Sequence, residues 1–108
     1  MRVFIFTVLL SISMISTVLH AGDVPKQILA KIKANAAADH PNDNSAQEGV
    51  INLQVKAYHE ARNYNDENVP IKVLKQIKRK AEQDYPYDFS AQEFGINLQV
   101  DSYSEAMN

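Results

Sequence analysis

The chain contains no cysteine among its 108 residues. Disulfide bonds, which often stabilise small exported domains with thin cores, are therefore excluded. Metal centres built on thiolates are excluded for the same reason. A lipid anchor of the bacterial lipoprotein kind also needs a cysteine after the signal sequence, so this form of membrane attachment is excluded as well.

Long apolar runs and an excess of basic residues are also missing beyond residue 21. Without a second long apolar run, further membrane-spanning helices are excluded. Once residues 1–21 are removed, 10 Lys and Arg residues stand against 13 Asp and Glu residues, a net charge of −3 (10 − 13). A general nucleic-acid-binding protein needs a net basic surface, so we expect no nucleic acid among the partners.

The N-terminus has the layout of a secretory signal peptide. Met1 and Arg2 give a short positive region, residues 3–19 are almost entirely apolar, and Ala21 provides a small residue at a cleavage site. A small residue is also usual two positions before the last residue of a signal peptide, and Leu19 departs from this pattern. An uncleaved membrane anchor therefore stays open as an alternative. We predict a signal peptide over residues 1–21, and a secreted or periplasmic protein of 87 residues (108 − 21) without membrane contact after cleavage.

What the sequence does contain is a duplication. Residues 24–63, here called copy one, align without gaps to residues 69–108, called copy two, and 22 of the 40 aligned pairs are identical. Every residue of copy one therefore has a counterpart 45 positions later (69 − 24). A duplicated unit of this length is typical of repeat architectures, in which each unit is one supersecondary structure.

The first half of each copy predicts an amphipathic helix. Pro25 and Pro70 suit the first helical position, where the missing N–H would be unpaired anyway. Each helix is expected to end before Pro41 or Pro86, because the residue preceding a proline is pushed out of the α region. Apolar residues recur at i, i+1, i+4 and i+8, which is one helical stripe. The stripe consists of Ile28, Leu29, Ile32 and Ala36 in copy one, and of Val73, Leu74, Ile77 and Ala81 in copy two.

The second half of each copy opens with a helix start signal. Residues 45–48 and 90–93 both read Ser-Ala-Gln-Glu, which matches the capping box. Asp43 and Asp88 are the alternative caps. Residues 51–55 alternate apolar and polar side chains, as a strand would, but the cap, the length and the Ala, Glu and Gln content favour a helix.

These elements predict an all-α protein. One domain, residues 22–108, is expected to contain a helical hairpin in each copy, with a short polar connector at residues 64–68. One hairpin of 40 residues cannot bury its apolar face alone. We therefore expect the two tandem hairpins to close into a small four-helix bundle, plausibly around a pseudo-twofold axis. An open two-unit solenoid is the alternative.

No pattern predicts a cofactor, a metal site or an enzyme. His40 and His59, the only histidines after residue 21, are not retained in copy two and do not have metal-ligand spacing. Ser45 and Ser90 are explained as caps and lack the surroundings of a catalytic serine. Paired aspartates also occur, but each pair flanks a proline turn, where Asp commonly bonds the local backbone. These pairs are Asp39 with Asp43 and Asp84 with Asp88.

Amide and phenol side chains retained in both copies are the candidate binding residues. They exceed what helix formation needs, because Asn is a poor helix former. We interpret them as two polar patches that bind a glycan or a peptide. The alternatives are that they link the helices of the bundle, or that the two copies diverged recently and still share residues without a function. The set consists of Gln47, Asn52, Gln54 and Tyr58, and of Gln92, Asn97, Gln99 and Tyr103.

Residues 84–93 read Asp-Tyr-Pro-Tyr-Asp-Phe-Ser-Ala-Gln-Glu and are followed by Ile96, Gln99 and Tyr103. This stretch resembles a repeat of small exported bacterial proteins, in which a Tyr-Pro-x-Asp-x-Ser-x-Gln turn leads into a helix. Copy one departs from it at His40 and Gly49. The resemblance implies export and helical structure, and it adds no chemistry.

The sequence thus predicts a small exported, non-enzymatic helical repeat protein that binds an extracytoplasmic protein or glycan, or has a structural role there. A membrane-active or toxin-like protein is the main alternative, because residues 70–80 combine apolar residues with five cations. An enzyme that uses the paired aspartates is the third hypothesis.

Overall fold

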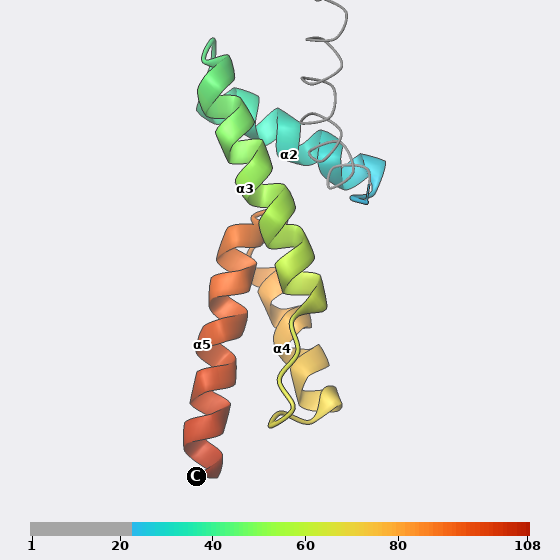
Figure 1. Cartoon of the computed structure of the whole chain (residues 1–108), viewed down its shortest axis with the longest axis vertical. Helices are drawn as coiled ribbons and strands as arrows, with labels where there is room; N and C mark the ends of the chain where they lie inside the picture. Colours follow the sequence, from blue (N-terminus) through green and yellow to red (C-terminus); the bar gives the residue numbers. More distant parts are fainter. Residues whose placement is uncertain (1–22) are drawn as a thin grey trace, which may run out of the picture.

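The computed structural model describes residues 23–108, and these residues form four helices and no strand. The helices are α2 (Lys26–Asp39), α3 (Asn44–Asn63), α4 (Ile71–Asp84) and α5 (Phe89–Met107) (Figure 1). The all-α prediction is confirmed, and so is the choice of helix over strand for the second half of each copy. The predicted signal peptide lies outside the described residues.

Aspartates, and not the predicted serines, begin the two long helices. The Asp43 carboxylate accepts a hydrogen bond from the Ala46 N–H at 3.0 Å, and that of Asp88 accepts one from the Ala91 N–H at 3.2 Å. The capping-box prediction for Ser45 and Ser90 was therefore wrong. Each helix begins directly after the aspartate, so the serine falls inside the first turn.

The prolines also lie one position earlier than predicted. Pro25 and Pro70 directly precede the first helical residues of α2 and α4. Their carbonyl groups accept hydrogen bonds from the N–H groups of Leu29 and Leu74, both at 2.9 Å. The prolines thus act as caps, and the rigid φ of the ring still sets the direction in which each helix starts.

Within each copy the two helices form a hairpin, and the two hairpins pack as the predicted small four-helix bundle. α2 packs on α3, α4 packs on α5, and the long helices α3 and α5 join the hairpins. α3 and α5 run in the same direction, and α5 begins beside the middle of α3 (Figure 1). The hairpin turn of copy two therefore lies against the side of copy one.

The core consists of two apolar clusters, one for each copy. The first belongs mainly to α2 and α3, with Ile32, Val55 and Tyr58 buried, and it also contains Phe89 from α5. The second belongs mainly to α4 and α5, and it also contains Ala61 from α3. Each cluster thus takes a residue from the other copy, and this exchange holds the hairpins together.

Candidate functional site

Two of the predicted binding residues hold the hairpin turns closed. The Nε2 atom of Gln47 donates to the His40 carbonyl oxygen, and that of Gln92 donates to the Tyr85 carbonyl oxygen, both at 2.8 Å. Each glutamine bridges from its long helix back to the residue that ends the preceding helix. Both copies retain these amides because the same turn needs the same hydrogen bond.

Gln54 connects the two copies directly. Its Oε1 atom accepts hydrogen bonds from the backbone N–H groups of Phe89 at 2.7 Å and Ser90 at 3.4 Å, and its Nε2 atom donates to Asp88 at 3.2 Å. The first N–H groups of a helix have no partner within the helix. The side chain of Gln54 therefore supplies the acceptor that the N-terminus of α5 needs.

Gln99, the counterpart of Gln54, is exposed and has no equivalent partner in the described chain. Its counterpart contact would reach Asp43 and the first residues of α3, but no hydrogen bond joins these groups within residues 23–108. A twofold axis would make both contacts equal. The expected pseudo-twofold relation is therefore wrong, because the copies are related head to tail.

The remaining predicted residues do not form one patch. Asn52 and Asn97 are exposed, and the Asn97 amide donates to the Glu93 carbonyl oxygen of its own helix at 3.2 Å. Tyr58 is buried with 5% of its surface exposed, whereas Tyr103 is half-buried. The structure thus brings Gln54 and Tyr58 together at the contact between copies, and it leaves the asparagines apart.

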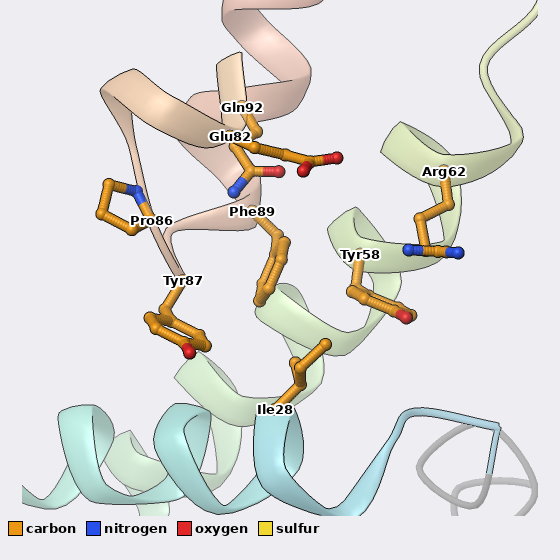
Figure 2. Close-up of a pocket in the computed structure, with 8 residues that line it drawn as sticks. All are labelled: Ile28, Tyr58, Arg62, Glu82, Pro86, Tyr87, Phe89 and Gln92. Atoms are coloured by element: carbon orange, nitrogen blue, oxygen red, sulfur yellow. The ribbon is translucent and has the colours of Figure 1, made fainter. Parts of the chain in front are cut away.

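A cavity of about 250 Å³ lies at this contact between the copies. We call it the junction cavity, and Figure 2 shows the side chains around it. α2, α3, α4, the turn of copy two and α5 all contribute to its lining. Its lining residues are Ile28, Tyr58, Arg62, Glu82, Pro86, Tyr87, Phe89 and Gln92.

Aromatic rings form much of the wall of the junction cavity. The rings of Tyr58 and Phe89 meet edge to face, with centroids 5.0 Å apart and planes at 89°. This geometry is favourable for aromatic pairs because a positive ring edge meets a negative ring face. The Lys31 ammonium lies 5.8 Å from the centre of the Tyr87 ring and helps to position it. Figure 2 shows Ile28 reaching toward these rings from α2.

The junction cavity also has one basic and one acidic side chain. Arg62 comes from the last turn of α3, and its guanidinium carbon lies 5.4 Å from the centre of the Tyr58 ring. Glu82 comes from α4 and extends its carboxylate toward the side of the cavity on which Arg62 lies (Figure 2). The two groups do not pair with each other in the described part of the chain. Both charges are therefore open to a ligand.

Tyr87 has a backbone conformation that bulky residues rarely adopt. Its φ is 64°, in the left-handed region, and the counterpart Asn42 has the same φ. Asn is common in this conformation, whereas a tyrosine there is an outlier. Strained residues of this kind concentrate at functional sites. The strain at Tyr87 places an aromatic ring in the junction cavity where copy one has a small amide.

Two groups near the contact of α3 with copy two have pKa values shifted toward the neutral form. Burial, followed by the nearby charge of Arg62, lowers the pKa of Lys78, whose ammonium donates to the Arg62 carbonyl oxygen at 3.0 Å. Burial, followed by the charge of Glu60, raises the pKa of Glu93. These shifts follow the general rule that burial disfavours the charged form of a side chain.

Reasoning from the residues that the copies share missed the junction cavity. Besides Ile28, whose counterpart is Val73, four lining residues differ in chemical kind between the copies: Arg62, Glu82, Tyr87 and Phe89. The replacements are Met107, Ala37, Asn42 and Asn44. Residues identical in both copies did not indicate this cavity. Large or charged residues that are present in one copy alone would have indicated it.

The histidines and paired aspartates do not form a metal site in residues 23–108, since no three His, Cys, Asp or Glu side chains gather there as ligands. Asp43 and Asp88 serve as helix caps, and Asp84 pairs with Lys80 at 3.2 Å. None of the described helices combines the length and apolar character needed to span a membrane. Comparisons found no matching protein-family model, no matching curated protein and no matching solved structure.

Proposed function

We propose that this protein is exported from the cytoplasm and acts outside it without catalysis. Its function would be to bind a small zwitterionic ligand, such as a dipeptide, in the junction cavity. The observation that carries the proposal is that two opposite charges, which do not pair with each other within residues 23–108, line one cavity together with aromatic rings. The signal-peptide pattern of residues 1–21 supports a secreted or periplasmic location.

The chemistry of the cavity suits the two ends of a peptide. The Arg62 guanidinium presents a planar set of donors that matches a carboxylate, so it would hold the C-terminal end of the ligand. The Glu82 carboxylate would hold the ammonium group. Because these groups do not neutralise each other, a ligand that carries both charges satisfies both at once.

The apolar wall suits the side chain of such a ligand. Ile28, Tyr58 and Phe89 belong to one apolar cluster, and all three line the cavity. A volume of about 250 Å³ is slightly below the usual range of roughly 300–1,000 Å³ for drug-sized ligands, which favours a dipeptide over a longer chain. The amide of Gln92 already serves the turn, so it contributes shape more than a new hydrogen bond.

The proposal is tested by NMR titration of the mature protein, residues 22–108, with the dipeptide Ala-Phe. We expect amide shifts at residues 58, 62, 82, 87 and 89. N-acetyl-Ala-Phe-amide, which lacks both charges, should bind at least tenfold more weakly. No shift with Ala-Phe, or equal binding of the two compounds, would contradict the proposal.

Matched variants separate the charges from the fold. Arg62→Met and Glu82→Ala introduce the residues that the other copy carries at the same positions, so each should fold normally. We expect each to weaken binding of Ala-Phe. Lys72→Met, on an exposed position of α4 outside the cavity, is the control and should leave binding unchanged.

The membrane-active alternative is less well supported by the packing of α4. Leu74 and Ala81 are buried in the core, and Ile71 is the exposed large apolar residue of this helix. Membrane insertion needs an apolar face that is free to leave the protein. Leakage from vesicles of anionic lipid, measured at low salt, would favour this alternative, and absence of binding to these vesicles would remove it.

A further inference from the structure

We propose that a second molecule of this protein docks head to tail onto α5, with its copy-one turn, residues 39–47, in the place that copy two occupies on α3. The inference concerns a different surface from the junction cavity and does not rest on the proposed ligand. It follows from the one-way relation of the two copies, which leaves one half of the contact unused at each end of the molecule.

The contact inside the molecule shows what such docking requires. Gln54 accepts the first N–H groups of α5, and Tyr58 packs against Phe89. Lys78 donates to the carbonyl oxygen of Arg62, at the C-terminal end of α3. The contact thus has three parts: an amide at a helix start, an aromatic ring, and a lysine at a helix end.

The acceptor surface for the same contact is present and uncovered on copy two. Gln99 is exposed and Tyr103 is half-buried. Ile77 is half-buried, whereas its counterpart Ile32 has only 1% of its surface exposed. Ser102 is exposed, whereas its counterpart Ala57 has only 4% of its surface exposed. Copy two is more open because no side chain within residues 23–108 covers it as Phe89 covers copy one.

The docking surface is present on copy one, and most of its residues are exposed in the described part of the chain. Asp43 caps α3 in the same way as Asp88 caps α5. The N–H groups of the two residues that follow it, Asn44 and Ser45, have no acceptor within residues 23–108, and these are the groups that Gln99 would bind. Lys33 is exposed and is the counterpart of Lys78, so it can reach the carbonyl end of a second molecule's α5.

Pairs of residues that share a cluster, a cavity or a contact between the two copies are replaced by pairs that also suit each other. Phe89 and Ala57 share the first apolar cluster. Their counterparts, Asn44 and Ser102, are both polar and can form a hydrogen bond. An isolated polar replacement on one side would be unfavourable against an apolar partner. The change on both sides keeps the contact complementary.

Two further pairs change together in the same manner. Arg62 and Glu82 both line the junction cavity, and their counterparts Met107 and Ala37 are both apolar. Lys31 lies over the ring of Tyr87, and the counterparts of these two are Gln76 and Asn42, which are both amides. In all three cases the two counterpart residues have matching chemistry. A contact between two molecules would maintain such matching, whereas residues on a free surface would not need it.

Docking of this kind is heterologous, so every added molecule presents a new acceptor surface. Association should therefore increase with concentration without stopping at a dimer, unless the chain of molecules closes into a ring. It should also be weaker than the contact inside the molecule, because the buried ring of Phe89 is replaced by an amide and the covalent connector is absent.

The test is analytical ultracentrifugation of the mature protein, residues 22–108, across a wide range of concentration. Gln99→Arg blocks the acceptor surface, and Asn44→Arg blocks the turn. Both sites are exposed, so circular dichroism should show an intact helical fold. We expect the wild type to form dimers and larger species and each variant alone to stay monomeric. An equimolar mixture of the variants should form dimers and nothing larger, because one intact surface of each kind remains.

A gain-of-function variant keeps the test informative if the wild type associates too weakly to measure. Asn44→Phe with Ser102→Ala restores between molecules the pair found inside the molecule, and should strengthen association at least tenfold. Arg62→Met is the control that alters the ligand cavity alone and should still associate. A double variant that stays monomeric, or a mixture of blocked variants that behaves like its components, would overturn the inference.

Discussion

The Oε1 atom of Gln54 accepts a hydrogen bond from the backbone N–H of Phe89 at 2.7 Å, so a side chain of copy one caps the N-terminus of a helix of copy two. The same glutamine also bonds Ser90 and Asp88. Its counterpart Gln99 has the same side chain, but within residues 23–108 it accepts no hydrogen bond from the start of a helix. Identical residues in two copies thus have different roles, because the copies are related head to tail.

Replacement of the two glutamines should therefore have unequal effects. Gln54→Ala is expected to cost about 1–2 kcal/mol of unfolding free energy, because the N–H of Phe89 is part-buried and loses its acceptor. Gln99→Ala, its matched control, should change stability by less than about 0.5 kcal/mol in dilute solution. Urea unfolding followed by circular dichroism measures both. Equal losses would contradict the head-to-tail relation.

The sequence predicted the helices and their approximate ends because local signals set them. Prolines stop α2 and α4, and in the apolar stripe of α2 Ile32 and Ala36 are buried while the other two residues are half-buried. The sequence left two candidate caps for each long helix, because Asp43 and Ser45 are both good caps, and the structure has the aspartate that was the alternative.

The junction cavity could not be predicted from the sequence because it depends on how the two hairpins are placed. Gln54 and Gln99 have the same local surroundings in the sequence, and only the packing of α5 against α3 distinguishes them. Arg62 and Glu82 are 20 residues apart (82 − 62) and have no shared pattern that would link them. Tertiary contact alone makes them neighbours.

Phe89 should be the largest single contributor to the contact between the copies. It has 7% of its surface exposed and packs edge to face on Tyr58. Phe89→Ala is expected to cost about 3 kcal/mol, through lost burial and the cavity left behind. Phe89→Leu, which keeps most of the volume, should cost about half as much. Thermal unfolding of both variants measures the difference, and a loss of only a few tenths for Phe89→Ala would contradict this packing.

A charge in the first cluster should be more harmful than a charge in the second. Ile32 has 1% of its surface exposed, so Ile32→Asp buries an unpaired carboxylate and should cost about 4 kcal/mol or more. Ile77 is half-buried, so the carboxylate in Ile77→Asp can reach water, and we expect about 2 kcal/mol. Denaturant unfolding ranks the two. A larger loss for Ile77→Asp than for Ile32→Asp would show that the second cluster is better buried than the first.

Tyr87→Asn should stabilise the protein while it weakens binding. Asn is tolerated at the φ of 64° that copy one already has at Asn42, so the variant relieves strain and should gain about 0.5–1 kcal/mol. The ring of Tyr87 is lost from the wall of the cavity, which should reduce binding of Ala-Phe. Calorimetric unfolding and the NMR titration together test both effects. Stabilisation with unchanged binding would remove Tyr87 from the site.

Stability should fall slightly as Glu93 ionises. Burial and the charge of Glu60 raise the pKa of Glu93 above its usual value of 4.5 in the folded protein. The folded state therefore binds this proton more tightly than the unfolded state does. The resulting stability is fully present below the unfolded pKa, and it is lost as the pH rises through the raised folded pKa.

Glu93→Gln removes this effect and should gain a few tenths of a kcal/mol, roughly 0.3, at about pH 7. The gain should shrink as the pH is lowered to about 4, where the wild-type group is protonated. Glu48→Gln, an exposed counterpart in copy one, is the control. Melting temperatures across this pH range measure both, and a gain for Glu93→Gln that did not depend on pH would point to another cause.

The most direct test of the central claim, that ligand binding belongs to the contact between the copies, is an isotope-filtered NOE measurement. Protein that comprises residues 22–108 would be isotope-labelled and saturated with unlabelled Ala-Phe. We expect NOEs from the ligand ring to the side chains of Ile28, Tyr58 and Phe89. NOEs to the exposed amides of Asn52 and Asn97 instead, or no NOE to the cavity at all, would contradict it.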